Sequence, residues 1–140
     1  MSLTTTTHLN FRGDARAALE FYRRVFGGDL AVVTYADAGN AARESEADQV
    51  LWGQVHSTDG FHVMAYDVPA SLPYDQGRNA SFVSVRGETV EEITGYWDAL
   101  AADSTVVVPL GPSGWARAYG MVRDRFGVVW VLDVVSDYSA

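Results

Sequence analysis

An internal repeat constrains the fold of this chain more than any other feature of its sequence. Residues 9–14 (LNFRGD) are echoed by residues 83–88 (VSVRGE), 74 positions later. The correspondence continues through apolar positions at helical spacing and into a second run of valines, 32–33 and 106–107. Because the offset is close to half of the 140 residues, the sequence predicts two similar modules.

Each module is predicted to have the order β-α-β-β-β. Module one covers about residues 5–68, a linker with two prolines and a glycine covers about 69–79, and module two covers about 80–136. Asp14 is expected to cap the first helix and Gly27 to end it, and Thr89 with Glu92 forms a capping box for the second helix. This pattern predicts a single α+β domain over 1–140, with two paired modules forming curved mixed sheets around a cavity and helices on the outer face.

Composition excludes several classes of function. The chain has no cysteine, which excludes disulfides, thiolate zinc sites and a cysteine nucleophile. A net charge of −8 argues against nucleic acid as a partner and favours cationic small molecules, although solubility is the simpler explanation. No apolar run is long enough to span a membrane and the N-terminus does not resemble a signal peptide, so a cytoplasmic location is expected.

Two motifs, one near each end of the chain, are specific enough to compare with known families. The opening motif is Leu9-Asn10-Phe11, Gly13, Ala15, Ala18-Leu19, Phe21-Tyr22 and Val25-Phe26-Gly27-Gly28. The closing motif is Pro109-Leu110, Trp115, Tyr119-Gly120-Met121, Asp124, Phe126-Gly127-Val128 and Trp130. These motifs resemble the vicinal oxygen chelate superfamily of glyoxalases, bleomycin-resistance proteins and dioxygenases, and the PhnB-like (demethylubiquinone-methyltransferase-like) subgroup is the most similar. The resemblance implies paired modules and a homodimer, and it does not fix a reaction.

In metal-using members of that superfamily, the ligands come from the first and last strand of each module. The matching positions here are His8 or Thr7, Ala65 or Tyr66, residues 80–82, and Val131. His8 alone is a ligand type, whereas catalytic metals normally take about three protein ligands. We therefore expect no chelated metal and no other cofactor. Asp67 and Asp133 lie just beyond these positions and are interpreted as turn or surface carboxylates at strand ends.

His56 and His62 lie on adjoining strands of one predicted hairpin and form a second possible metal or substrate site. Strand alternation weakens this hypothesis, because it is interpreted as placing His62 and Met64 on one face and Gln54 and His56 on another. Relatives of the PhnB-like type carry a His-Ala-Glu motif where this chain has Trp52-Gly53-Gln54. Two partly exposed strand histidines are the preferred interpretation.

Aromatic and polar residues of the middle and last strands are the candidates for ligand binding. The set is Trp52, Gln54, Met64, Tyr66, Trp115, Tyr119 and Met121. Trp130 is expected in the core, and Trp115 at the mouth of a cavity or at a dimer interface. No catalytic residue can be assigned, since no nucleophile elbow or phosphate loop occurs.

Three functions follow from these patterns. The first is a small-molecule-binding protein without the usual metal, with a flat cationic ligand favoured by charge. The alternative is a metal-dependent lyase, isomerase or dioxygenase acting on a vicinal-oxygen substrate. The third is an oligomerising or regulatory module that has no ligand of its own.

Overall fold

The computed structural model describes residues 2–136, and the chain forms two compact units that divide between Gln76 and Gly77. This boundary falls inside the segment 69–79. Both units have the order β-α-β-β-β that the repeat predicts. The helices begin at Ala15 and Val90, so the structural offset of 75 residues is close to the offset in the sequence.

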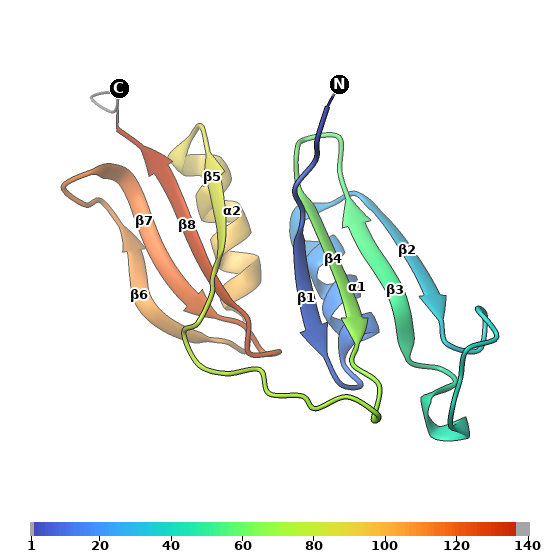
Figure 1. Ribbon diagram of the computed structural model, residues 1–140. Helices are drawn as coiled ribbons and strands as arrows, with labels where there is room; N and C mark the ends of the chain where they lie inside the picture. The colour runs from blue at the N-terminus through green and yellow to red at the C-terminus, as the bar shows by residue number, and fades with distance from the viewer. Residues whose placement is uncertain (1, 137–140) are drawn as a thin grey trace. The chain divides into compact units, whose positions relative to one another are not determined.

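The first unit is a four-stranded mixed sheet with one helix. Its elements are β1 (Thr7–Phe11), α1 (Ala15–Phe26), β2 (Asp29–Thr34), a short 3-10 helix (Glu44–Glu46), β3 (Val50–His56) and β4 (His62–Asp67). The strand order is β1-β4-β3-β2, in which β1 and β4 are parallel and the other neighbours are antiparallel. Figure 1 shows α1 against one face of this sheet.

The second unit repeats this topology. Its elements are β5 (Val83–Gly87), α2 (Val90–Ala101), β6 (Thr105–Gly111), β7 (Ala116–Arg123) and β8 (Val129–Val135). The strand order is β5-β8-β7-β6, with β5 and β8 parallel and α2 against one face (Figure 1). The structure thus confirms the α+β class and the two mixed sheets.

The core of each unit lies between its helix and its sheet. The apolar face of α1 is buried through Ala15, Ala18, Leu19, Phe21, Tyr22 and Phe26. Close packing requires a glycine in each sheet: a Cβ on Gly53 would lie 2.6 Å from Leu19, and one on Gly120 would lie 2.8 Å from Trp97. Trp130 is fully buried, as predicted. Among residues 2–136, no helix of the same unit covers the opposite face of either sheet, and we call this the helix-free face.

The N-terminus of the first helix is capped by the side chain of Asp67, and not by that of Asp14 as the sequence predicts. Asp14 occupies the N-cap position and makes no side-chain capping hydrogen bond. Asp67, 1% exposed, instead accepts hydrogen bonds from the backbone N–H groups of Gly13 (2.7 Å), Ala15 (3.1 Å) and Val50 (2.9 Å). Asp67 ends β4, so its predicted place at a strand end is correct, but it is not a surface carboxylate, because it is buried as the acceptor of N–H groups that have no partner within the helix. The other caps are as predicted: Thr89 accepts from the Glu92 N–H, and Gly27 ends α1 at φ 78°.

Candidate functional site

Strand register gathers most of the predicted site residues of the first unit on one face. His8 pairs with Met64, Met64 with Gln54, and Asn10 with Tyr66. Buried Val63 and Ala65 alternate with these positions on β4 and lie toward α1. The residues that share the helix-free face are Thr6, His8, Asn10, Trp52, Gln54, His56, His62, Met64 and Tyr66, and we call this set the His62 face.

The interpretation that placed His62 and His56 on different faces was wrong. The two residues are direct antiparallel partners, with ring centroids 4.3 Å apart and planes at 21°. Directly opposed residues of an antiparallel pair always share a face. The five-residue connection between His56 and His62 sets this register, and strand alternation within each strand separately does not reveal it.

Hydrogen bonds orient the ring of His62. Its Nε2 lies 2.8 Å from Gln54 Oε1, and its Nδ1 lies 3.1 Å from the Thr6 hydroxyl oxygen. Since an amide oxygen only accepts, Nε2 carries the proton and Nδ1 accepts from Thr6. Burial lowers the pKa of His62 below its ordinary value, and the neighbouring His56 lowers it further. Both effects favour the neutral form of the imidazole.

His8 offers a lone pair on the same face. Its Nδ1 lies 2.9 Å from Asn10 Oδ1, so Nδ1–H donates and Nε2 remains an acceptor. The ring also meets Tyr66 edge-on, with centroids 5.4 Å apart. Trp52, 36% exposed, adds a large aromatic surface beside these polar groups. The His62 face thus combines hydrogen-bonding groups of fixed orientation with aromatic area.

The remaining predicted residues lie on the helix-free face of the second sheet. Tyr119 is paired with Asp133, and Met121 with Val131. Trp115, 54% exposed, meets Tyr119 edge-on at a centroid distance of 5.2 Å. We call Arg86, Trp115, Tyr119, Met121, Val131 and Asp133 the Arg86 face.

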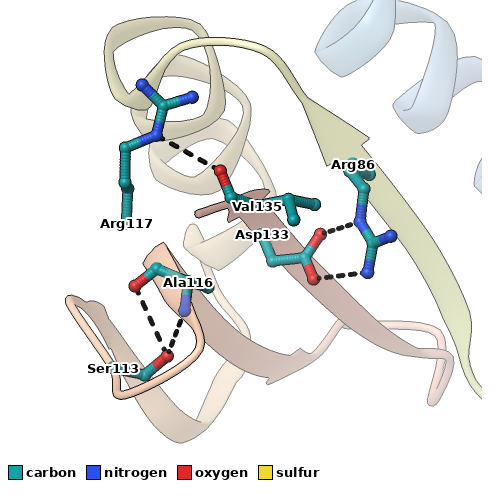
Figure 2. A network of polar contacts seen from close by, with 6 residues as sticks. All are labelled: Arg86, Ser113, Ala116, Arg117, Asp133 and Val135. Carbon is teal, nitrogen blue, oxygen red and sulfur yellow. Dashed lines mark hydrogen bonds and ion pairs between the residues drawn. The ribbon is translucent and has the colours of Figure 1, made fainter. Parts of the chain in front are cut away.

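Asp133 was interpreted, like Asp67, as a turn or surface carboxylate at a strand end. This interpretation was wrong, because Asp133 lies inside β8 and is buried. Its side chain is 7% exposed and forms a bidentate pair with Arg86, Nε to Oδ1 at 3.0 Å and Nη2 to Oδ2 at 3.1 Å (Figure 2). The carboxylate raises the pKa of Arg86 through these hydrogen bonds and through its charge. The carboxylate is buried because its partner lies beside it on β5, a contact between distant segments.

Arg117, near the start of β7, is held by backbone groups. Its guanidinium donates to two backbone carbonyls, those of Val135 (3.3 Å) and Glu88 (3.1 Å). Figure 2 shows the first of these contacts beside the turn closed by Ser113 and Ala116. Arg117 thus ties β7 to the segments around it.

The residues present do not fit the metal that the superfamily implies. Over residues 2–136, no group of three or more histidine, cysteine, aspartate or glutamate side chains could hold a metal ion. His8 is paired with Met64 and not with a carboxylate, and the buried Asp67 and Asp133 are engaged by backbone N–H groups and by Arg86.

Comparison with known proteins places the chain in a family. The model of the Glyoxalase/Bleomycin resistance protein/Dioxygenase superfamily matches residues 6–132. The chain belongs to this superfamily. It is 26% identical over 136 residues to the protein YjdN of Escherichia coli, which covers 91% of this chain and 92% of that one.

Solved structures of this superfamily's fold are similar over almost the whole chain. Protein PA1353 from Pseudomonas aeruginosa is 30% identical, with a TM-score of 0.83 over 97% of this chain and 100% of that one. The PhnB protein from Bacillus cereus is 25% identical, with a TM-score of 0.75 over 95% and 100% of the two chains. These likenesses agree with the PhnB-like resemblance of the motifs.

No helix within residues 2–136 is long and apolar enough to cross a membrane.

Sequence reasoning missed three contributors to these faces. Thr6 and Asn10 gave no signal, because their roles depend on His62 and His8 beside them. Arg86 lies inside the repeat, at the position that matches Arg12. The signal available in the sequence was a charged residue within a predicted strand, which indicates a partner of opposite charge nearby. The two arginines have different hydrogen-bond partners: Arg12 donates to backbone carbonyls such as that of Pro69, whereas Arg86 donates to the Asp133 carboxylate.

Proposed function

We propose that the protein binds a small, flat organic molecule on the His62 face and does so without a chelated metal. The observation that carries this proposal is the hydrogen-bonded row Thr6–His62–Gln54 beside the rings of Trp52 and Tyr66. Small-molecule sites combine aromatic area with a few polar groups of fixed orientation. This row supplies both within one sheet.

The chemistry of the face favours a ligand with an aromatic ring and hydrogen-bonding groups. Trp52 and Tyr66 provide ring surface that stacks at little conformational cost. His8 Nε2 accepts a hydrogen bond, and the Gln54 amide nitrogen donates one, because its oxygen is engaged by His62. With a net charge of −8, a cationic ring is favoured over an anionic one through long-range attraction.

A thermal-shift screen of cationic aromatic compounds tests this proposal. We expect at least one compound to raise the melting temperature of the metal-free protein, with the effect lost in Trp52→Leu and Gln54→Ala. Val107→Ala is the control, since Val107 is exposed on β6 of the other unit. If no compound stabilises the protein, or if the two variants respond like the control, binding at the His62 face is wrong.

The His56–His62 contact favours a second candidate, a metal-dependent lyase, isomerase or dioxygenase with a displaced site. Two histidines on one face are a common start for a metal site. The geometry opposes it as it stands, because the rings are stacked and both nitrogens of His62 are already hydrogen-bonded. Titration with zinc, nickel and ferrous ions separates the two proposals: one ion bound per chain, lost in His56→Ala, would favour the enzyme.

A further inference from the structure

The Arg86 face carries a group that the proposed function does not use. Arg86 is 63% exposed in its side chain, and the Asp133 carboxylate that holds it is 7% exposed. A buried carboxylate that grips Nε and Nη2 fixes the plane of the guanidinium. The arginine is therefore oriented before any ligand arrives.

The orientation leaves hydrogen-bond donors of Arg86 available. A guanidinium has five N–H groups, of which two are donated to Asp133. Within residues 2–136, Arg86 makes no other hydrogen bond. The free N–H groups lie on Nη1 and Nη2, and together they form the planar fork that matches the two oxygens of a carboxylate.

Beyond its partner Asp133, the helix-free face near Arg86 carries apolar and aromatic side chains. Arg86 pairs with Asp133, and Asp133 pairs with Tyr119, so the tyrosine lies two strands away, about 10 Å from backbone to backbone. The adjacent row contains Val131 and Met121, both partly exposed. Trp115 extends the surface beyond Tyr119. This spacing suits a molecule with an anionic end and a ring.

We propose that the Arg86 face binds the carboxylate of a small aromatic acid, with Arg86 as the anchor and Tyr119 with Trp115 as the ring contact. Among the six residues of the Arg86 face, Asp133 is the one carboxylate, and it is engaged by Arg86 rather than free to bind a cation. The site belongs to the second unit alone and goes beyond the proposed function, which rests on the first.

Titration with phenylacetate, followed by amide and arginine side-chain NMR, tests this proposal. We expect saturable shifts at the Arg86 Nε–H and at the amides of Tyr119, Met121 and Val131. The neutral analogue 2-phenylethanol has a similar size but no carboxylate. It should bind with an affinity at least about tenfold lower, because the hydrogen bonds between Arg86 and a charged group are lost. Equal responses to the two compounds would overturn the proposal without any variant.

Variants distinguish a specific contact with Arg86 from a general effect of positive charge on the protein. Arg86→Gln should weaken phenylacetate binding at least about tenfold. That variant leaves Asp133 buried without its cation, so the double variant R86Q/D133N removes both charges and should fold while still failing to bind. Arg16→Gln, on the exposed side of α1, removes the same charge at a distance and should bind normally.

The outcomes also distinguish this proposal from the previous one. Gln54→Ala should leave the phenylacetate shifts unchanged, and loss of binding in that variant would contradict a site confined to the second unit. Retention of binding in R86Q/D133N, or an equal loss in Arg16→Gln, would show that Arg86 is not the anchor. Failure of the cationic screen on the His62 face would leave the phenylacetate result intact.

Discussion

Asp67 illustrates how much one side chain contributes when it satisfies several backbone groups. Its two carboxylate oxygens accept three N–H groups, from the turn before α1, from the first turn of α1 and from the start of β3. No buried side-chain polar atom among the described residues lacks a hydrogen-bond partner. A single carboxylate therefore links three segments of the first unit.

Replacing Asp67 by alanine should lower the free energy of unfolding by about 3–5 kcal/mol, because buried N–H groups lose their acceptor. Asp14→Ala is the matched control, since Asp14 makes no side-chain cap, and it should change stability by less than about 0.5 kcal/mol. Urea unfolding monitored by tryptophan fluorescence measures both. An equal loss in the two variants would show that Asp14 contributes to the cap in solution.

His62 should make stability depend on pH. Its pKa in the folded protein lies below the ordinary value of 6.5, so the unfolded chain takes up a proton first as the pH falls. The free energy of unfolding should thus be highest above about pH 6.5 and decrease below it. Replacing His62 by glutamine should reduce this decrease between pH 7.5 and 5, as measured by urea unfolding. An unchanged slope would indicate that His62 is not held neutral.

At the scale of the element, glycines set how closely each helix approaches its sheet. Gly120 of β7 lies under Trp97 of α2, and a Cβ there would also lie 2.9 Å from the backbone of Leu110 on β6. Backbone cannot move aside as a flexible side chain can. Gly95, within α2, has no heavy atom within 4 Å of an added Cβ. Replacing glycine by alanine should therefore have opposite effects on stability at these two positions.

Gly120→Ala should destabilise the protein by about 1–3 kcal/mol through overpacking. Gly95→Ala should stabilise it by up to about 1 kcal/mol, because glycine is a poor helix former. Thermal unfolding of the two variants beside the parent chain measures both changes. Stabilisation by Gly120→Ala would mean that the helix and sheet of the second unit are not in close contact.

At the scale of the whole molecule, the edge strands of the two sheets are β1 and β2 in one and β5 and β6 in the other, and over residues 2–136 none of them pairs with a further strand of its own unit. Val106 and Val107 on β6 are 46% and 50% exposed. Exposed apolar edge strands favour association with another chain. The homodimer implied by the superfamily resemblance remains a proposal that these features support.

Light scattering coupled to size exclusion should therefore give a mass of twice 15.2 kDa. Replacing Val107 by lysine should shift the protein toward a monomer if β6 takes part, since a charge at a strand edge opposes pairing. A mass of 15.2 kDa for the parent chain would contradict the dimer. An unchanged dimer in the Val107 variant would place the interface on another edge.

The sequence by itself determined the architecture of this protein. Apolar spacing, paired turns and the repeat are local signals, and they predicted both helices, the strand order along the chain, the Gly27 and Thr89 caps and the burial of Trp130. The superfamily also followed from short motifs, which the match over residues 6–132 confirms. These features depend on neighbours in the chain, which the sequence contains directly.

Only the tertiary structure decided which side chains meet. Asp67 and Asp133 became internal partners of a helix N-terminus and of Arg86, and His56 came to lie against His62 rather than on another face. Each of these contacts depends on strand register between segments, and a register shift of one residue turns every side chain to the opposite face. Periodicity along one strand does not contain that information, so the sequence specified the scaffold while the pairing of strands specified the chemistry.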